Sequence, residues 1–529
     1  MTYVVVVADR VADPGLEILL KQPELEIVSV VGDAKRLDQE LARAHALLVR
    51  SDTQVTEERI ARAPHLMVIG RAGTGVDNID VDAATRRGIA VLNAAGANTV
   101  SAAEHAVALL LALVRRIPWA AASMRDGAWD RKRFAGSELC DKQLGVVGLG
   151  RVGLRVATIA RALGMTILAH DPYLPEERAA DLGIELVDLE TLLATSDMVT
   201  LHVPLTDDTR HLIDRERLRL MKRGSYVVNT ARGGLVDDGA LLEALESGHL
   251  AGAALDVFDP EPLPGDSPMR RASGLLLTPH LAASTSEAQE RVATEICRYV
   301  RDALLSGALR GAINLPGVPG DALQRLSGVL DLARGLGRLA AGIAGGAVRS
   351  IDVVYGGRHE AAPRPVMLAA VEGVLSAAGI TPVTLVNAAE RARQRGIATS
   401  RSVGAPLAGF ETTVGVSVAT AERVTTVDGA MLGEVAARVI RIDGFDVDVP
   451  AHGTMLVLRN RDVPGVIGRV GTVLGTAGIN VGSYHQSRRD QAGSEALAAI
   501  VVDEEPNGNV LSTLAGLPDL LEVKVARLG

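Results

Sequence analysis

The chain has 529 residues, too many for a single hydrophobic core, so three or four domains are expected. Aromatic residues make up only 2% of the sequence and the net charge is −9, which argues against nucleic-acid binding, because such surfaces rely on aromatic stacking and basic patches. The two cysteines, Cys140 and Cys297, lie far apart and outside any ligand motif, so they predict neither a disulfide framework nor a metal site and are typical of a reducing compartment.

The first part of the chain, residues 1–98, alternates short apolar runs with amphipathic segments. Its opening run, YVVVV, is too short for a signal peptide and has no basic leader, so it predicts a first β-strand. The alternation predicts an α/β domain with a parallel sheet. Because no apolar run reaches the roughly 20 residues that a membrane helix needs, we expect no membrane association and a cytoplasmic protein.

A second α/β unit is predicted from residue 99 onward. A long apolar helix, AAEHAVALLLALVRRI, begins at Ser101 and carries Pro118 near its end. Near-continuous apolar runs such as QLGVVG and SYVVN follow it. Runs of this kind are typical of parallel strands that are covered on both faces.

The rest of the chain predicts two further domains behind a linker. An amphipathic helix, EAQERVATEICRYVRDALLSG, is followed by INLPGVPGD, whose prolines and glycines predict a linker. Residues 317–452 alternate apolar and polar runs and predict a separate α/β domain without a phosphate loop. Residues 453–529 predict the order βαββαβ, which is a ferredoxin-like sandwich.

A dinucleotide-binding loop is predicted where the strand QLGVV meets the next helix. Gly148, Gly150 and Gly153 have the GxGxxG spacing that permits a tight turn, the approach of a pyrophosphate and close helix packing. Asp171 ends the next predicted strand about 20 residues on, where an acid binds the ribose hydroxyls and repels a 2′-phosphate. The alternatives are a chance glycine match and a turn-forming Asp before Pro172, but the strand–loop–helix–strand context favours NAD as the cofactor.

Three candidate catalytic residues stand near the ends of successive predicted strands. His280 follows GLLLTP, Arg232 follows SYVVNTA and Glu261 follows ALDVFDP. Open α/β sheets bind their ligands at the carboxyl ends of the strands. Taken singly, the alternatives are a capping histidine, a surface arginine and a solvated loop acid; the three together predict an active site.

The motifs GLGRVG, HDPY, NTARGGLVD, LDVFDPEP and TPHLAAST resemble those of the D-isomer-specific 2-hydroxyacid dehydrogenases, over about the first 315 residues. The C-terminal layout further resembles the long-form members of that family that act on 3-phosphoglycerate. The resemblance implies an α/β chain with a discontinuous flavodoxin-like substrate-binding domain, a Rossmann-like NAD-binding domain, an α/β intervening domain of the allosteric substrate-binding type, and a ferredoxin-like ACT regulatory domain. Their expected bounds are residues 1–98 plus 284–316, 99–283, 317–452 and 453–529.

The resemblance also implies a role for each candidate in oxidising an alcohol. His280 would be the base for the hydroxyl proton, Glu261 would orient its ring, and Arg232 would grip the substrate carboxylate and polarise the C2 oxygen. Asp256 is expected at the nicotinamide amide and Val203 beside the adenine. The residues implied to bind NAD are Thr74, Gly148, Gly150, Arg151, Val152, Gly153, Asp171, Val203, Thr230, Ala231, Asp256, Ala282 and Ala283.

Substrate contacts are expected from the first domain as well. The turn RAGTG, with Gly73 and Gly75, resembles the family's substrate carboxylate loop. Arg50 and Arg71 could bind a phosphoryl group, although two surface arginines are the alternative. The basic run RKR at 131–133 could reach a neighbouring subunit, or it could be a solvated turn.

An effector site is implied in the C-terminal domain. Asp462 is expected at a helix start with Pro464 in its first turn, and Asn480 on the following strand. In the family, an acid and an amide at these places bind an amino acid, usually L-serine, across a dimer interface. The alternative is that Asp462 is only an N-cap and Asn480 only a turn residue.

The motifs predict an NAD-dependent dehydrogenase, and the resemblance implies that it oxidises 3-phospho-D-glycerate to 3-phosphooxypyruvate, the first step of L-serine biosynthesis, with feedback by L-serine. A homotetramer is expected, with the long helix from Ser101 at a dimer face. One alternative is an enzyme for another D-2-hydroxyacid, such as glycerate or 2-hydroxyglutarate. The other is a non-catalytic amino-acid or nucleotide sensor, against which the complete set of Arg232, Glu261 and His280 argues.

Overall fold

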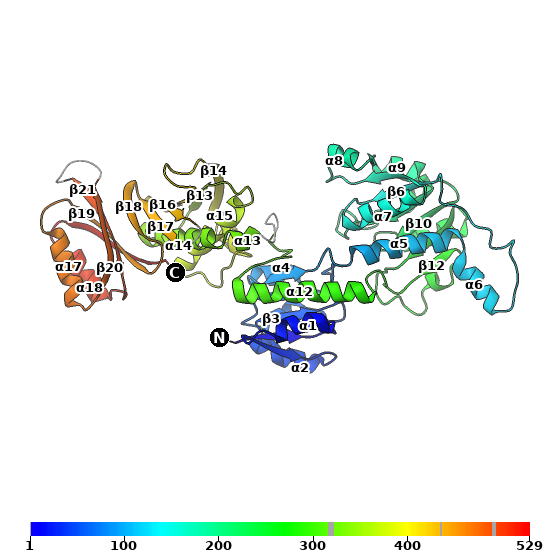
Figure 1. Ribbon diagram of the computed structural model, residues 1–529, viewed down its shortest axis with the longest axis horizontal. Helices are drawn as coiled ribbons and strands as arrows, with labels where there is room; N and C mark the ends of the chain where they lie inside the picture. Colours follow the sequence, from blue (N-terminus) through cyan, green and yellow to red (C-terminus); the bar gives the residue numbers. More distant parts are fainter. Residues whose placement is uncertain (1, 316–321, 434–435, 489–493, 529) are drawn as a thin grey trace.

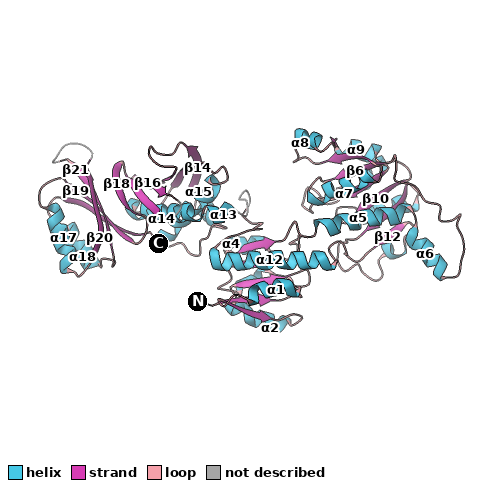
Figure 2. Cartoon of the chain, viewed as in Figure 1, coloured by secondary structure: helices cyan, strands magenta, loops and turns pink. Residues whose placement is uncertain are grey.

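The computed structural model of the protein describes residues 2–315, 322–433, 436–488 and 494–528. In that part of the chain, four β-sheets follow one another along the longest axis of the molecule, and helices cover their faces (Figure 1, Figure 2). The second sheet lies at one end and the fourth at the other, with the first and third between them. The chain is therefore a mixed α/β protein, as the sequence predicts.

The first sheet has the parallel order 2-1-3-4-5, which is that of flavodoxin-like folds. Its strands are β1 (Tyr3–Val7), β2 (Leu25–Ser29), β3 (Ala46–Val49), β4 (Val68–Arg71) and β5 (Ala90–Asn93). The helices around it are α1 (Asp13–Leu20), α2 (Ala34–Glu40), η1 (Leu41–Arg43), α3 (Glu57–Ala61), α4 (Val81–Arg86) and α12 (Ser286–Ser306). Successive side chains of a strand point to opposite faces, so Val4 and Val6 pack beside α2–α4 while Val5 and Val7 pack against α1 and α12. Both faces are thus buried, and α12 returns to this sheet from much later in the chain.

The second sheet has the parallel order of a Rossmann fold, 3-2-1-4-5-6, with one further strand at the edge. Its strands are β6 (Gln143–Val147), β7 (Thr166–His170), β8 (Glu185–Leu186), β9 (Met198–Leu201), β10 (Ser225–Asn229), β11 (Leu250–Leu255) and β12 (Leu275–Leu277). The helices of this part are α5 (Thr99–Val114), α6 (Ile117–Arg125), α7 (Arg151–Ala162), α8 (Glu176–Asp181), α9 (Leu189–Thr195), α10 (Arg215–Leu220), α11 (Asp238–Glu246) and η2 (Pro268–Arg271). One face is buried under α5 and α7, and the other under α9, α10 and α11.

The third sheet is mixed, because β13 pairs with β14 in parallel and with β15 in antiparallel. Its strands are β13 (Ser350–Gly356), β14 (Ala398–Gly404), β15 (Thr412–Ala419), β16 (Val424–Leu432), β17 (Ala436–Ile442) and β18 (Phe445–Pro450). The helices of this part are α13 (Ala322–Arg325), α14 (Ser327–Ala344), α15 (Pro363–Ala377) and α16 (Ala388–Gln394).

The fourth sheet is antiparallel in the order β20-β21-β19-β22, and its elements follow the predicted βαββαβ sequence. They are β19 (Thr454–Arg461), α17 (Val466–Thr476), β20 (Val481–Arg488), β21 (Glu495–Val502), α18 (Gly508–Ala515) and β22 (Leu520–Arg527). One face of the sheet packs under α17 and α18.

The other face of the fourth sheet shares a core with the third. Met455 and Val457 of β19 and Leu497 of β21 belong to the same buried cluster as Leu336 of α14 and Phe445 of β18. These two parts of the chain therefore have one continuous apolar interior.

Charged side chains join the same two parts beside that core. The guanidinium of Arg423 donates to Asp443 (2.8 Å) and to Glu522 of β22 (2.9 Å). Arg459 of β19 donates to the same Asp443 carboxylate (2.6 Å). A carboxylate between two arginines thus holds the third and fourth sheets together by charge as well as by apolar contact.

The predicted helix from Ser101 is two helices. Arg116 takes a left-handed conformation (φ +53°), which ends the first helix, and Pro118 lies in the first turn of α6 instead of near the end of α5. Proline is well tolerated in a first turn because the missing N–H has no intrahelical partner there. Among the described residues no single helix is long and apolar enough to cross a membrane; α5 and α6 together pass by length and composition, but they are bent by 63°.

Most of the predicted linker INLPGVPGD, from residue 316 to 321, lies outside the described residues.

Candidate active site

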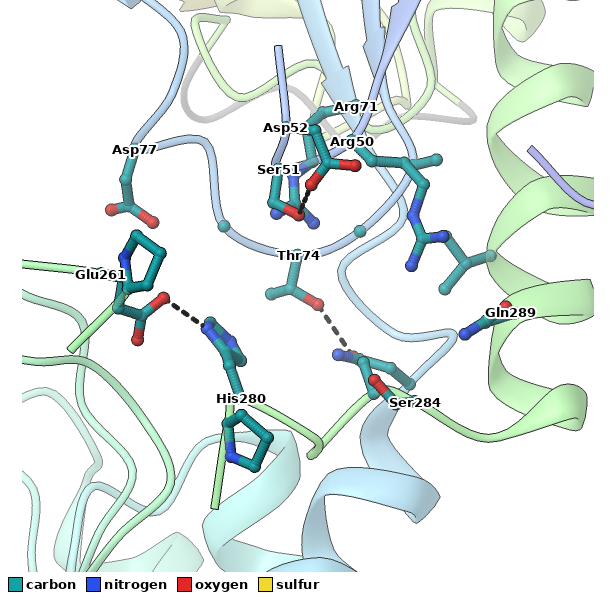
Figure 3. Close-up of a pocket in the computed structure, with 18 of the residues that line it drawn as sticks. Arg50, Ser51, Asp52, Arg71, Thr74, Asp77, Glu261, His280, Ser284 and Gln289 are labelled. Carbon is teal, nitrogen blue, oxygen red and sulfur yellow. Dashed lines mark hydrogen bonds and ion pairs between the residues drawn. The ribbon is translucent and has the colours of Figure 1, made fainter. Parts of the chain in front are cut away.

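A histidine and a glutamate meet at the end of the second sheet. His280 follows β12 and Glu261 follows β11, and Nδ1 of His280 lies 2.8 Å from Oε2 of Glu261. Their side chains are 46% and 36% exposed. Figure 3 shows this pair on one side of a cavity, facing the loop that carries Thr74. Because Nδ1 is engaged by the carboxylate, Nε2 is the ring nitrogen left for a proton transfer in the cavity.

The main chain at His280 has an uncommon conformation. Its φ is +53°, in the left-handed region that residues with a side chain rarely adopt. The amide of His280 donates to the carbonyl of Asp256 (2.9 Å), and the amides of Leu281 and Ala282 donate to the Asp256 carboxylate (2.8 and 2.9 Å). Asp256 thus fixes the segment that carries the histidine.

Asp256 itself is fully buried. Its carboxylate also accepts a hydrogen bond from Oγ1 of Thr278 (2.6 Å) and lies 3.2 Å from Nε2 of His105 on α5. Burial alone would raise the pKa of Asp256, but hydrogen bonds from His105, Thr278 and the Leu281 amide outweigh it and lower that pKa below its ordinary value. The side chain thus holds the segment that carries His280, and its contact with a nicotinamide amide stays a prediction.

Glu261 is held in its ionised form. Burial would raise its pKa, but the hydrogen bonds from His280 and from the amide of Phe258 (2.9 Å), together with the positive charge of Arg232, lower the pKa of Glu261 overall. A carboxylate that stays ionised keeps the histidine ring in one orientation and stabilises the ring when it gains a proton.

Arg232 reaches across to the first domain. It follows β10, and its Nε donates to Oδ2 of Asp77 (3.0 Å), in the loop after β4. Its Nη1 donates to the carbonyl of Ala231 (2.6 Å). A Cβ on Gly75 would lie only 1.9 Å from Nη2, so the glycine is what allows the guanidinium to approach this loop. Arg232 therefore lies against the predicted carboxylate loop.

Arg71, the last residue of β4, has a largely buried guanidinium group. Its guanidinium lies under Gly73, where a Cβ would be 1.4 Å from Nη1, and its Nε has no hydrogen-bond partner in the described part of the chain. Burial, and then the positive charge of Arg232, lower the pKa of Arg71 to about 10. Since this is still far above neutral, Arg71 is a partly buried cation whose charge an anion could compensate.

One cavity of about 840 Å³ collects residues from both domains. It opens between the carboxyl ends of the first and second sheets, where open α/β sheets bind ligands. Figure 3 shows Arg50 and Arg71 on the side opposite His280. The predicted site residues that line it are Arg50, Arg71, Gly73, Thr74, Gly75, Arg232, Glu261, His280 and Ala283.

The glycine loop between β6 and α7 fits a dinucleotide pyrophosphate. Gly148 has φ +91° and packs against His202 and Val203, so the turn is tight. A Cβ on Gly153 would lie 2.0 Å from the Gly148 carbonyl, whereas the space beyond Gly150 is open. The loop thus has the tight turn, the close packing and the open approach that a pyrophosphate needs.

Asp171 lies beside that loop, after the end of β7. One carboxylate oxygen accepts from the amide of Leu149 (2.9 Å) and the other from the amide of Tyr173 (3.0 Å). Its negative charge is therefore fixed next to the glycine loop, which fits a ribose hydroxyl partner.

The remaining cofactor candidates are distributed over neighbouring segments. Thr230 and Ala231 follow β10, and the Thr230 hydroxyl is buried with no partner among the described residues, which suits a ligand contact. Arg151 and Val152 begin α7, above the glycine loop. Ala282 is buried and its carbonyl accepts from Ser101 (2.8 Å).

The effector candidates differ in part from their predicted positions. Helix α17 begins at Val466 with Gly465 as its N-cap, so neither the N-cap alternative for Asp462 nor the placement of Pro464 in the first turn is correct. Asp462 instead accepts from Gln486 (3.3 Å) and Arg488 (3.0 Å) of β20.

Asn480 directly precedes β20 and donates to Asp503 (2.6 Å), so it is adjacent to the strand instead of on it.

The basic run at 131–133 is exposed, follows α6, and does not line the cavity. Cys140 is exposed and Cys297 is buried, and both are free thiols. Within the described ranges, no group of three or more His, Cys, Asp or Glu side chains could hold a metal ion.

Sequence reasoning missed two hydrogen-bonding partners of the site residues. Asp77, which pairs with Arg232, stands two residues after Gly75 in the RAGTGVD motif, which marks the loop but does not identify the partner. His105, which pairs with Asp256, lies in an otherwise apolar helical run, where a histidine is ordinarily a core residue. No local pattern distinguishes it.

Three family models match successive parts of the chain. Residues 107–282 match the D-isomer specific 2-hydroxyacid dehydrogenase, NAD binding domain. Residues 325–443 match the D-3-phosphoglycerate dehydrogenase intervening domain, and residues 454–519 match the ACT domain.

Curated relatives match the chain from end to end. The D-3-phosphoglycerate dehydrogenase of Synechocystis is 39% identical over 525 residues, covering 98% of this chain and 94% of the relative. The protein of the same name from Archaeoglobus fulgidus is 39% identical over 531 residues (99% and 100%), and that from Mycobacterium tuberculosis is 40% identical over 528 residues (99% and 99%).

Solved structures resemble the first part of the chain. D-lactate dehydrogenase from Aquifex aeolicus, complexed with NAD and lactic acid, has a TM-score of 0.51 at 31% identity and covers 57% of this chain and 96% of its own. NAD-dependent formate dehydrogenase from Staphylococcus aureus, in complex with NAD, has a TM-score of 0.52 at 32% identity (57% and 96%).

Proposed function

The chain belongs to the D-3-phosphoglycerate dehydrogenase family, and we propose that it catalyses the NAD-dependent oxidation of 3-phospho-D-glycerate to 3-phosphooxypyruvate, which commits carbon to L-serine biosynthesis. The observation that carries the proposal is the meeting of the His280–Glu261 pair with Arg50, Arg71 and Arg232 in one cavity. This substrate has an alcohol to be deprotonated and two anionic ends, and the cavity offers a base and three cations.

The histidine and glutamate would carry the proton. Nε2 of His280 would take the proton of the C2 hydroxyl and become protonated. NAD, when bound, would accept the hydride of the C2–H bond, so that the alcohol becomes a ketone. Glu261 stabilises the charge that the ring gains.

The arginines would hold the two ends of the substrate. Arg232 binds the carboxylate and polarises the C2 oxygen with charge-assisted hydrogen bonds, beside the Gly73–Gly75 turn. Arg50 and Arg71 bind the phosphate, and the buried Nε of Arg71, which has no hydrogen-bond partner among the described residues, supports this assignment.

The residues at the glycine loop would bind NAD. The open space at Gly150 and the helix start at Arg151 suit the pyrophosphate, and Asp171 suits the ribose. Thr230, Ala231 and Val203 remain the proposed contacts farther along the nucleotide. We keep residues 1–98 plus 284–316, 99–283, 317–452 and 453–529 as the proposed domains.

The test is the formation of NADH from NAD and 3-phospho-D-glycerate, with hydrazine to remove the keto product. Turnover by the parent and its near-loss in His280→Ala support both the reaction and the base. Turnover with glycerate or 2-hydroxyglutarate but not with 3-phosphoglycerate would indicate another D-2-hydroxyacid dehydrogenase, and no turnover at all would indicate a sensor.

Regulation and assembly form a second part of the proposal. We propose a cytoplasmic homotetramer with L-serine as the effector of the ACT domain, and the presence of that domain supports regulation by a small molecule. Asp462 and Asn480 are the proposed serine ligands, and the basic run at 131–133 is the proposed contact to a neighbouring subunit. Inhibition of the parent by L-serine, its loss in Asp462→Ala, and the mass in solution from light scattering test these points.

A further inference from the structure

We propose that Asp77 is an internal place-holder: in the empty site its carboxylate occupies the position on Arg232 that the carboxylate of the substrate takes on binding. The inference rests on the proposed function, because it assumes that Arg232 binds a substrate carboxylate. It adds a residue with an opposing role, which lowers the affinity of the site for its own ligand.

The hydrogen bonds of Arg232 give the first argument. Nε donates to Oδ2 of Asp77 at 3.0 Å, and Nη1 donates to the carbonyl of Ala231 at 2.6 Å. A carboxylate binds a guanidinium best through two neighbouring N–H groups. A ligand that approaches the edge formed by Nε and Nη2 therefore has to displace Asp77.

The packing around the pair gives the second argument. An ideal Cβ on Gly75 would lie 1.9 Å from Nη2 of Arg232 and 2.8 Å from Oδ2 of Asp77, so the glycine leaves room for the two groups to meet. The Asp77 side chain is 67% exposed and the Arg232 side chain 28%. The carboxylate can thus leave for solvent without breaking any packed structure, whereas the arginine stays in place.

The charge of the cavity gives the third argument. Arg50 and Arg232 each lower the pKa of Arg71, because both cations repel it, whereas the negative charges of Asp77 and, to a smaller extent, Asp9 raise that pKa. Without an anion between them, three arginines at one cavity are costly. Asp77 supplies that anion in the empty site, and a substrate with two anionic ends supplies it in the occupied one.

The pair also connects the two domains. Asp77 belongs to the loop after β4 and Arg232 to the loop after β10, so their ion pair bridges the cavity. When a ligand displaces Asp77, the direct ion pair between the two loops is lost, and the ligand, bound to Arg232, then connects them instead. Only a ligand with a carboxylate at this position makes that exchange, which favours 2-hydroxyacids over simple alcohols.

The test measures binding separately from turnover. Oxalate, an unreactive carboxylate, is titrated by calorimetry into the full-length parent, Asp77→Asn, Asp77→Glu and Asp52→Asn, each with NAD present. Asp52 is the matched control, because it is an exposed acid of the same cavity that contacts Ser51 instead of Arg232. Asp77→Asn and Asp52→Asn remove the same charge, whereas Asp77→Glu keeps a carboxylate.

The expected result is that Asp77→Asn binds oxalate about two- to fivefold more tightly than the parent, as expected for loss of an exposed ion pair. Asp52→Asn changes the affinity less, and Asp77→Glu stays near the parent. Equal effects of the two asparagine variants would overturn the inference, since the general field of the cavity would then explain both. Weaker binding by Asp77→Asn would overturn it as well, because Asp77 would then assist the ligand.

Failure of the proposed function would look different. If the parent does not oxidise 3-phosphoglycerate but the oxalate difference persists, the substrate assignment is wrong and the place-holder stands. If oxalate binds to none of the four proteins, Arg232 is not a carboxylate ligand and the inference fails.

Discussion

Nδ1 of His280 and Oε2 of Glu261 are 2.8 Å apart, although the two residues follow different strands of the second sheet. This relationship predicts unequal losses in two variants. His280→Ala should lower kcat by about 10²- to 10⁴-fold, the usual range for a general base. Glu261→Gln keeps the shape but not the charge, so it should lower kcat by less. Both are measured as initial rates of NADH formation.

The control for these variants is NAD binding, followed by protein fluorescence, which neither change should alter. If Glu261→Gln turns over like the parent, the carboxylate has no part in the reaction and its contact with His280 is only structural.

The Asp256 carboxylate predicts a change in stability at low pH. Its pKa is lowered in the folded protein, so the stability that it contributes is complete above its ordinary pKa of 3.8 and is lost as the pH falls through the lower, folded value. Asp256→Asn should therefore be less stable than the parent at pH 7, and the difference should narrow below about pH 4. Urea unfolding at pH 7, 5 and 3.5 measures this. A difference that stays constant with pH would exclude the ionised carboxylate as its cause.

The buried charge of Arg71 predicts selectivity for a phosphorylated substrate. Arg71→Gln should raise KM for 3-phosphoglycerate by about 10- to 100-fold, because it removes charge-assisted hydrogen bonds to the phosphate. Its effect on glycerate should be small, since that molecule has no phosphate. The measurement compares kcat/KM for the two substrates in parent and variant; equal losses on both would contradict phosphate binding by Arg71.

The position of Asp171 beside the glycine loop predicts cofactor preference. Asp171→Asn removes the charge and keeps one acceptor oxygen, so it retains one of the two hydrogen bonds from the Leu149 and Tyr173 amides. We expect kcat/KM for NADP to rise and that for NAD to fall, each by about tenfold, which corresponds to about 1.4 kcal/mol. An unchanged ratio of the two values would show that another residue excludes the 2′-phosphate.

Much of the fold could be predicted because the signals were local. The valines of β1 and the run before Gly148 are apolar without interruption, which is how strands covered on both faces differ from half-exposed ones. The loop of Gly148 and Gly153 could be predicted for the same reason, since a tight turn and a close helix require glycines at short, regular spacing.

The contacts that were missed are between residues far apart in sequence. Asp77 meets Arg232 only because the first and second sheets face one cavity, and no spacing encodes that. His105 is a single polar residue of the apolar helix α5. Its contact with Asp256 depends on a residue that is far away in the sequence. Asp462 was misplaced because an acid before a proline resembles a helix start, whereas its partners on β20 are tertiary.

Because the third and fourth sheets share one core, the C-terminal sandwich is not a domain that can be removed or exchanged on its own. The side chains that the fourth sheet buries against the third belong to Met455, Val457 and Leu497. If the chain were cut between the two sheets, each piece would expose an apolar surface to water. Exchange of the C-terminal βαββαβ unit between relatives would therefore need matched replacement of the facing residues, Leu336 and Phe445 among them.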